Sequence, residues 1–537
     1  MKKIYKSFLV SALAFTGLTQ AQDVQWMTST PINYNLNPEM PVQPACASAN
    51  RIYTARMVDY SLDYGSDIFG SMAIDCYDPS GTLMWTYPLG DSVTIKCITS
   101  DASGNVFIGG EYMETLHMGT NDSLENTDSG LNINLVLFSL DVTGNLTWKR
   151  NVSLAHPVAQ EISAIGMDHL SSCWYELSYF DSAKIIRLDP NGMETQSYLI
   201  TGIRTLSSFS FDPMGNLYLT GSSGLMNITI GNFSMFVPES YMMFFSRIDA
   251  AGNCNWIRLA YDVTFQSPQI VAADNGDAYV AGTLMDSTSL GAVVFDGVEW
   301  VYDIFLAKVD SSGNFSWGVE VPHQPTLTGD FQRGKNNFMD VDSAGNVYMA
   351  GTIRGRVDWG NGVISDAGPI PSIGISILSF DSSGTARWHI SGGAMGFITP
   401  YSLIVSGVDE CYFANSVVGE LTLDSITTNQ GGNYAFVLGK ISTAVTGIYS
   451  PDMKNDFVIY PNPVDKFLSY GPLNPNAATS ADAEISISNI VGEEIMKITP
   501  LTLRVNSVGQ VDVSTLPPGI YFLSAGDVKK KFVVQAP

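Results

Sequence analysis

One short pattern recurs along most of this 537-residue chain and constrains its fold more than any other feature. The pattern is Asp-x-x-Gly-Asn, followed by alternating apolar and aromatic residues that end on Gly. Clear copies begin at Asp101, Asp212 and Asp342, and a shortened copy begins at Asp274. Weaker copies lie at residues 49–53, 168–174 and 409–412. A fixed alternation of this kind indicates a repeat architecture.

A second pattern, an apolar run followed by Asp-x-x-Gly-Asn-x-x-Trp, comes after each copy of the first. Copies that end on Trp begin at Asp78, Asp141, Asp249, Asp310 and Asp381. Residues 189–192 form a copy without Trp, and a seventh apolar run, 434–441, has no Trp after it. Together the two patterns give seven units of about 61 residues.

The chemistry of these residues predicts two β-hairpins in every unit. Asp bonds the backbone two residues further on, and Gly takes the positive φ that closes a short turn. Apolar and aromatic residues that alternate on both sides of the turn predict strands. Four strands are the content of one propeller blade, so we expect an all-β, seven-bladed β-propeller. Two independent β-sandwiches are the alternative, but they do not explain seven alternating repeats.

The N-terminal strand is expected to complete the last unit. Residues Val24–Thr28 include Trp26, which has no Asp-x-x-Gly turn before it. We therefore predict that this segment pairs with residues 434–441 as the outer strand of the seventh blade. Such pairing closes the ring and removes two exposed sheet edges.

The first 21 residues are typical of a secretory signal peptide. Lys2, Lys3 and Lys6 precede an apolar core at residues 8–15, and we expect cleavage after Ala21. The apolar core is too short to cross a bilayer, and no later stretch is long enough. The mature chain is therefore predicted to be exported and soluble.

The net charge of −25, with 27 basic and 52 acidic residues, excludes binding of nucleic acid through a basic surface. Most of the acidity lies in residues 22–456, which hold 45 acidic and 18 basic residues. We interpret it as a solubility device. Calcium is a minor alternative, because each repeated loop offers one Asp and lacks the alternating carboxylates of a calcium loop. We predict no cofactor.

Cysteine and histidine offer little evidence of catalysis or metal binding. Six cysteines without a CxxC pair allow 15 disulfide connectivities, but lone cysteines in apolar strands are usually small buried hydrophobes. We predict no metal site and no catalytic residue, since the histidines do not show metal-ligand spacing and no HExxH, GxSxG or P-loop motif occurs. The histidines are His117, His156, His169, His323 and His389.

The repeats resemble the SBBP-type seven-bladed β-propeller repeats of secreted bacterial proteins. Asp342–Tyr348 and Asp310–Trp317 show the two alternating halves of that family's pattern. The resemblance spans residues 23–445 and implies a propeller over residues 22–445, followed by a linker at 446–456. It says little about activity, because propellers host many functions.

Residues 457–537 differ from the repeats, since they are close to neutral and contain short alternating runs typical of a small Ig-like β-sandwich. Three stretches resemble the C-terminal sorting domain of the type IX secretion system of Bacteroidota. Its characteristic residues here are Tyr460, Pro461, Asn462, Pro463, Gly519, Ile520, Tyr521, Lys529, Lys530 and Lys531.

The resemblance implies that the type IX machinery recognises residues 457–537 and carries the chain across the outer membrane. It also implies removal of the module, with release or attachment to surface lipopolysaccharide. An ordinary accessory β-domain is the alternative.

We expect a monomeric, non-enzymatic binding or adhesion protein for an extracellular glycan or protein. A secreted glycan- or peptide-degrading enzyme and a structural surface-layer component are the alternatives. Insertions between the second and third strands of a unit are expected at one rim, where function tends to lie. Candidate ligand-face aromatics there are Trp300, Tyr302 and Trp359, although packing within the insertions is the favoured interpretation.

Overall fold

The computed structural model describes an all-β chain that forms two compact units, Met1–Ala444 and Val445–Pro537. No helix among the described residues is long and apolar enough to cross a membrane. The described residues are 22–33, 44–48, 50–64, 67–126, 133–152, 161–224, 226–239, 242–260, 268–284, 287–296, 303–321, 329–334, 337–367, 373–393, 398–424, 426–443, 457–460, 464, 466–472, 485–489, 493–498, 509–525 and 528–534. The predicted signal peptide lies outside them and stays a prediction.

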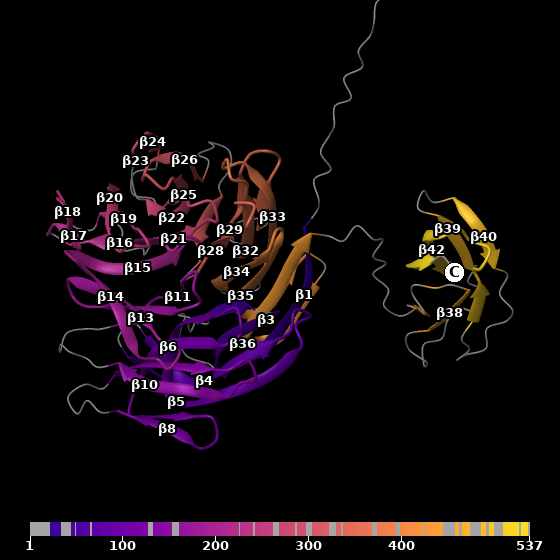
Figure 1. Cartoon of the computed structure of the whole chain (residues 1–537), viewed down its shortest axis with the longest axis horizontal. Helices are drawn as coiled ribbons and strands as arrows, with labels where there is room; N and C mark the ends of the chain where they lie inside the picture. The colour runs from indigo at the N-terminus through magenta and orange to yellow at the C-terminus, as the bar shows by residue number, and fades with distance from the viewer. Residues whose placement is uncertain are drawn as a thin grey trace, which may run out of the picture. The chain divides into compact units, whose positions relative to one another are not determined.

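Antiparallel sets of four strands are the basic element of the first unit (Figure 1). One sheet has the order β15 (Ile203–Phe211), β16 (Leu217–Ser223), β19 (Met243–Ile248), β20 (Cys254–Ala260). The next has the order β21 (Gln269–Ala272), β22 (Ala278–Leu284), β25 (Asp303–Val309), β26 (Phe315–Glu320). A third places β27 (Asp330–Arg333) and β28 (Met339–Val341) beside β29 (Val347–Arg354), followed by β32 (Ile373–Phe380) and β33 (Ala386–Gly393).

Two larger sheets contain the same set with additional strands. The six-stranded sheet is β11 (Ile165–Met167), β12 (Cys173–Ser178), β13 (Ser182–Leu188), β14 (Glu194–Thr201), β17 (Ile228–Ile230), β18 (Phe233–Met235). The nine-stranded sheet has the path β2 (Ala45–Ser48), β3 (Arg51–Tyr64), β4 (Asp67–Tyr77), β5 (Leu83–Ser100), β6 (Val106–Tyr112), β9 (Asn134–Leu140), β10 (Leu146–Val152), with the hairpin of β7 (Thr115–Met118) and β8 (Asp122–Glu125) beside it. The long strand β5 pairs with β4 through its first half and with β6 through its second half, so it belongs to two sets.

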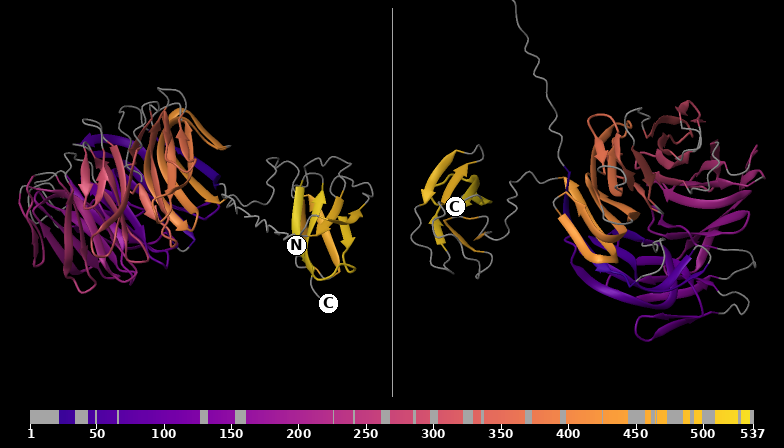
Figure 2. Two further views of the ribbon diagram at one scale, coloured as in Figure 1. Left: turned by 90° about the horizontal axis from the view of Figure 1, so that it is seen from above. Right: turned by 180° about the vertical axis from the view of Figure 1, so that it is seen from behind.

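The last sheet of the first unit contains the N-terminal strand, as predicted. Its order is β34 (Ile398–Gly407), β35 (Glu410–Leu423), β36 (Ile426–Thr443), β1 (Gln22–Pro31). Val24 pairs with Ile441 and Thr28 with Leu438, and the Val24 backbone N–H donates to Asp424 Oδ2 at 3.0 Å. Seen from behind, the last strands of the unit lie beside its first strands (Figure 2).

The first strands of successive sets contact one another in a closed circuit. β2 contacts β5, and β5 contacts β11. The contacts continue from β11 through β15, β21 and β28 to β34, and β34 contacts β2 again. Side chains bond to backbone across these junctions. Asp340 Oδ2 accepts the Val405 N–H at 2.7 Å, and Ser402 Oγ accepts the Ala45 N–H at 3.0 Å. The last of these bonds joins strands 357 residues apart in sequence.

Four of the repeated tryptophans join their set to the next one by a hydrogen bond. An indole Nε1–H donates to the backbone carbonyl of the residue after Asp in the next Asp-x-x-Gly turn, at 3.0–3.1 Å. This contact occurs in the pairs Trp26–Pro79, Trp85–Val142, Trp256–Ser311 and Trp317–Ser382. The buried Nε1 of Trp388 has no acceptor among the described residues, because the following set takes its fourth strand from β1 and has no second turn.

Extra hairpins fill the predicted insertions and pack between neighbouring sets. β17 and β18 belong to the connection between β16 and β19, yet β17 pairs with β14 of the preceding set. The hairpin of β23 (Thr288–Leu290) and β24 (Val293–Phe295) contacts β20 and β26, while β30 (Arg356–Asp358) and β31 (Ile364–Asp366) contact β27 and β33. Both of these hairpins lie between the second and third strands of a set, where insertions were expected.

The second unit consists of two small sheets around its own core. One has the order β37 (Phe457–Tyr460), β38 (Phe467–Pro472), β41 (Gly509–Asp512), and the other has the order β40 (Glu494–Ile498), β39 (Ile485–Asn489), β42 (Gly519–Ala525), β43 (Val528–Val534). Leu468, Ile487, Leu523 and Phe532 are fully buried between them.

Candidate functional site

The repeated aspartates act as turn formers. Asp101 Oδ1 accepts the backbone N–H groups of Ser103 and Asn105 at 2.9 Å, and Asp101 Oδ2 accepts the Asn105 amide at 2.8 Å. Gly104, with φ +85°, donates its N–H to the Asp101 carbonyl at 3.0 Å. The carboxylate is therefore engaged within its own turn, as the sequence predicts.

Equivalent turns show the electrostatic effect of these bonds. The Ser80 hydroxyl and the Thr82 N–H hold the pKa of the exposed Asp78 carboxyl below its ordinary value. The Asn253 backbone N–H likewise lowers the pKa of the Asp249 carboxyl. In the part of the chain that the structure describes, no group of three or more His, Cys, Asp or Glu side chains is placed to hold a metal ion.

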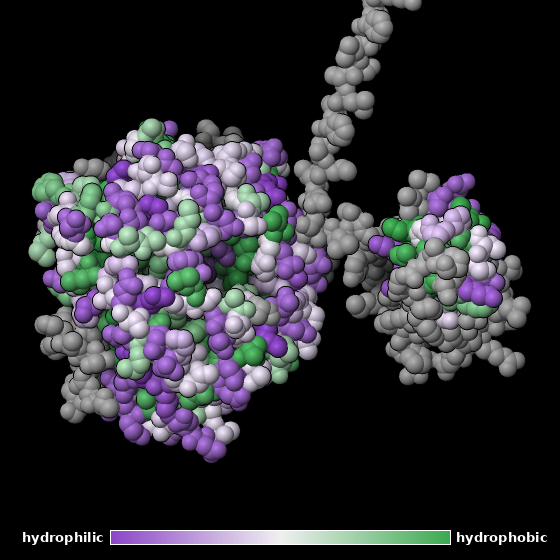
Figure 3. Space-filling view, viewed as in Figure 1, coloured by the Kyte–Doolittle hydropathy of each residue, from purple (hydrophilic) through white to green (hydrophobic). Residues whose placement is uncertain are grey.

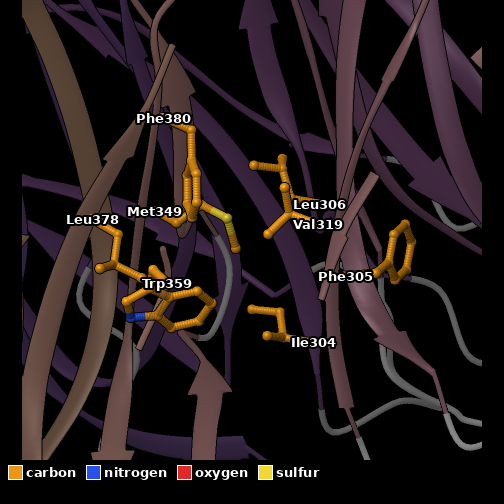
Figure 4. Close-up of a pocket in the computed structure, with 8 residues that line it drawn as sticks. All are labelled: Ile304, Phe305, Leu306, Val319, Met349, Trp359, Leu378 and Phe380. Carbon is orange, nitrogen blue, oxygen red and sulfur yellow. The ribbon is translucent and has the colours of Figure 1, made fainter. Parts of the chain in front are cut away.

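Of the three candidate ligand-face aromatics, only Trp359 lies in the described part of the chain, and it is buried. The side chain is 9% exposed, packs edge-on against Phe331 and Phe380, and donates its Nε1–H to Ser365 Oγ at 3.0 Å. Figure 4 shows its ring beside a small apolar cavity of about 10 Å³, which is too small for a sugar ring. The ring of Trp359 is therefore packed against neighbouring apolar side chains in this structure. Trp300 and Tyr302 lie outside the described residues.

The cysteines and histidines are dispersed. All six cysteines are free, and burial raises the pKa of the Cys76 thiol to about 11. His117 and His169 are exposed in different sets, and burial lowers the pKa of the half-buried His389. His156 and His323 lie outside the described residues.

A buried carboxyl near the innermost strands was not predicted. Glu176 on β12 is fully buried, and its Oε2 lies 3.1 Å from the Ser163 N and 2.6 Å from Ser163 Oγ. Ser178 Oγ bonds to Oε1. Desolvation by burial raises the pKa of the Glu176 carboxyl from 4.5 to about 8, against the lowering effect of the Ser163 and Ser178 hydroxyls.

The surroundings of Glu176 suit its protonated form. Ser163 Oγ also lies 3.3 Å from the Leu206 carbonyl, so a protonated Glu176 can donate to Ser163 while Ser163 donates to Leu206. Lys96, 9% exposed, lies 3.9 Å from the half-exposed Glu161 carboxylate. Through Ser163, Glu176 on β12 is thus connected to the segment before β11 and to Leu206 on β15. The only sequence signal was a glutamate within an otherwise apolar and aromatic strand.

The C-terminal unit brings the three sorting-domain stretches together. Val464, directly after the Tyr-Pro-Asn-Pro stretch, bridges Val534 and donates its N–H to the Val533 carbonyl at 2.8 Å. On β42, the Tyr521 ring lies 5.8 Å from the Phe532 ring, and its hydroxyl donates to the Pro517 carbonyl at 2.8 Å.

Strand β43 forms one edge of its sheet and carries the lysine stretch. Lys530 pairs with Leu523 and Lys531 with Phe522, and Lys529 pairs with Ser524. Lysines on an edge strand discourage pairing with further strands. Of the first stretch, Tyr460 ends β37, whereas Pro461, Asn462 and Pro463 lie outside the described residues.

Residues 458–535 match the family described as secretion system C-terminal sorting domain. The C-terminal unit is a sorting domain. It indicates export by type IX secretion to the cell surface or the extracellular space, and it implies interaction with the type IX machinery.

No curated protein matches the chain in sequence. Similar solved structures include a puromycin hydrolase, with 11% identity, 85% of this chain and 63% of that chain covered, and a TM-score of 0.36. Porphyromonas gingivalis dipeptidyl peptidase 4 has 10% sequence identity and a TM-score of 0.31, and the match covers 77% of this chain and 63% of that chain. A member of the DUF4221 family from Bacteroides vulgatus has 10% sequence identity and a TM-score of 0.30, and the match covers 62% of this chain and 93% of that chain. The chain spans about three fifths of the two hydrolases, and these TM-scores are too low to assign a fold or a function.

Proposed function

We propose that this protein is a secreted or surface-displayed binding or adhesion module for an extracellular glycan or protein, built on a seven-bladed β-propeller. The sorting domain delivers it, and residues 22–445 provide the binding surface. The observation that carries the proposal is the closed circuit of contacts from β2 through β34 and back to β2 in an exported chain. Such a scaffold holds the loops between its strands at fixed positions, where binding residues tend to lie.

The blade count is supported by the sets of four strands. Counting β5 in both of its sets and β1 in the last set accounts for one set per sequence repeat. The contact of Trp26 with Pro79 supports closure between the last blade and the first one. We propose that the repeats are of the SBBP type and that the C-terminal unit is Ig-like.

The second candidate is a glycan- or peptide-degrading enzyme on the same scaffold. Lys96, Glu161 and Glu176 near the innermost strands favour it, since a buried carboxyl with a raised pKa can serve in acid catalysis. The fully buried position of Glu176 weighs against contact with a substrate. We therefore rank binding above catalysis.

A glycan and peptide array of the mature secreted chain, with and without calcium, tests the proposal. Saturable binding without turnover of the bound ligand is the expected result. Release of cleaved products from the array would support the enzyme instead. No binding under either condition would contradict the binding function.

The fate of the sorting domain completes the proposal. We propose that the domain is removed after export and that the propeller is released or attached to surface lipopolysaccharide. Mass spectrometry of the protein from culture medium and from washed cells tests this step. A chain that retains residues 457–537 in both fractions would contradict removal.

A further inference from the structure

One serine hydroxyl lies between two acceptors where the set that begins with β11 meets the set that begins with β15. Ser163 Oγ is 2.6 Å from Glu176 Oε2, within its own set, and 3.3 Å from the carbonyl oxygen of Leu206 on β15. A serine hydroxyl has one proton, so it cannot donate to both oxygens at once. The protonation state of Glu176 therefore decides which of the two bonds the hydroxyl donates.

The two states of Glu176 give two different junctions. A protonated Glu176 donates to Ser163 Oγ, and the Ser163 hydroxyl then donates to Leu206 in the next set. An ionised Glu176 can only accept, so the Ser163 hydroxyl turns to Oε2 and leaves the Leu206 carbonyl. The Ser163 N–H and the Ser178 hydroxyl can bond to the carboxyl in both states. Loss of the proton thus exchanges a bond between sets for a bond within one set.

The following junction contains the same type of link without the carboxyl. Ser207 Oγ is 2.6 Å from the carbonyl oxygen of Pro268 in the next set and 3.3 Å from the Thr220 carbonyl oxygen in its own set. Thr220 and Glu176 occupy equivalent positions, since each is the fourth residue of its strand, β16 and β12. The Ser207 junction therefore has a neutral residue where the Ser163 junction has a carboxyl, which makes it an internal reference.

Burial and charge both favour the protonated form of Glu176. Hydrophilic residues are spread widely over the face of the first unit shown in Figure 3, whereas the Glu176 side chain is fully buried. Desolvation accordingly raises the pKa of its carboxyl, and the carboxylate of Glu161, before β11, raises it further. The thiols of Cys97 on β5 and Cys173 on β12 are neutral, because burial raises their pKa values.

The cations on the strands packed against β11 and β12 are engaged with other groups. They are Lys96 on β5 with Glu161, Lys184 and Arg187 on β13 with Tyr179 and Asp168, and Arg204 on β15 with Phe180. On β13, the residue that pairs with Glu176 is the apolar Ile185. The surroundings therefore favour the form of Glu176 that leaves the Ser163 hydroxyl bonded to Leu206.

We propose that Ser163 and Glu176 form a proton-dependent clamp between the β11 set and the β15 set. The clamp is closed while Glu176 is protonated, and it opens when the proton passes to solvent and the Ser163 hydroxyl leaves the Leu206 carbonyl. With a pKa of about 8 for Glu176, the change falls between about pH 7 and pH 9, so a mildly alkaline medium loosens this junction. The clamp is a property of the scaffold and does not rest on the binding function proposed above.

Hydrogen–deuterium exchange of the mature full chain tests this inference. Exchange is measured by mass spectrometry from pH 7 to pH 9 and is corrected for the pH dependence of the intrinsic rate. Peptides that cover residues 161–167 and 203–211 report on the clamp, and peptides that cover residues 268–272 report on the Ser207 junction. Asp340, a second buried carboxyl, has its pKa raised to about 6 and therefore changes its protonation below this range.

Two variants fix the clamp in one state. Glu176→Gln keeps a neutral donor at every pH, so exchange at the clamp should stay slow. Ser163→Ala removes the hydroxyl, so exchange should be fast at both ends of the pH range. In the parent, the corrected exchange at the clamp should rise about fivefold from pH 7 to pH 9, as expected for the loss of one net hydrogen bond. Exchange at the Ser207 junction should not change, and circular dichroism verifies that each variant is folded.

The clamp would be overturned by any of three results. The first is a parent whose corrected exchange at the clamp does not change with pH. The second is a rise that Glu176→Gln retains, because another group would then be responsible. The third is an equal rise at the Ser207 junction, because the whole unit and not one junction would then be loosened.

Discussion

The contact between Trp26 and Gly81 gives the sharpest test of how the first unit closes. Trp26 belongs to β1 in the last sheet, and Gly81 belongs to the turn between β4 and β5. Gly81 has φ +83°, and a Cβ there would lie 2.8 Å from Trp26 Cε3. Gly81→Ala therefore carries two costs, a left-handed alanine and a collision with the indole.

The two costs can be separated. A left-handed alanine costs about 1–2 kcal/mol, and overpacking adds about 1–3 kcal/mol. Gly360→Ala is the matched control, because Gly360 also has φ +83° but a Cβ at that position would have no atom within 4 Å. We expect it to show the backbone cost alone.

Trp26→Ala removes the indole and its 3.1 Å bond to the Pro79 carbonyl. In that background Gly81→Ala should lose its collision and cost no more than Gly360→Ala. The double-mutant cycle, measured by urea denaturation of the mature chain, should therefore give a coupling energy of about 1–3 kcal/mol. Additive effects, within about 0.5 kcal/mol, would refute the contact between the last and first sheets.

Three further predictions concern Glu176, the tryptophan hydrogen bonds and the sorting domain. The raised pKa of Glu176 means that its stabilising contribution is complete below about pH 4.5 and is lost as pH rises toward about 8. Glu176→Gln imitates the protonated form at every pH. The melting temperature of the variant minus that of the parent should therefore increase between about pH 4.5 and pH 8. A difference that does not change with pH would contradict a raised pKa of the buried Glu176 carboxyl. Trp256→Phe should cost about 1 kcal/mol in urea denaturation, because Trp256 Nε1 donates to Ser311 at 3.0 Å. Trp148→Phe should cost less, since the buried Trp148 Nε1 has no acceptor among the described residues, and equal costs would contradict this role of the indole bond. A chain that ends at Pro451 lacks the sorting domain and should accumulate in the periplasm, as measured by cell fractionation, and its normal secretion would argue against sorting through residues 458–535.

Local features of the fold were predictable from the sequence because their causes are local. Asp101 and Gly104 form their turn through bonds that span at most four residues, so the repeated pattern identifies each hairpin. The lone Trp26 identified the missing strand of the last sheet, and the structure pairs β1 with β36 as expected. The sorting domain was likewise predictable, because its characteristic motifs are short stretches of contiguous residues.

Contacts between sets could not be predicted from the sequence, because they join residues that are distant in the chain. The glycine at position 81 was explained from sequence by its φ alone, whereas packing shows a second reason, the indole of Trp26 from the other end of the unit. The burial of Trp359, in the β30–β31 hairpin, depends on Phe331 of β27 and Phe380 of β32, which belong to the separate five-stranded sheet.

The same holds for the buried carboxyl group. The pKa of Glu176 depends on Ser163 and on complete desolvation, which come from segments outside its own turn. The sequence by itself thus determined the turns, the strands and the export signal, since their hydrogen bonds and recognition motifs are local in the chain. Only the tertiary structure decided which side chains are buried, because burial depends on neighbours that the repeats bring together from distant positions.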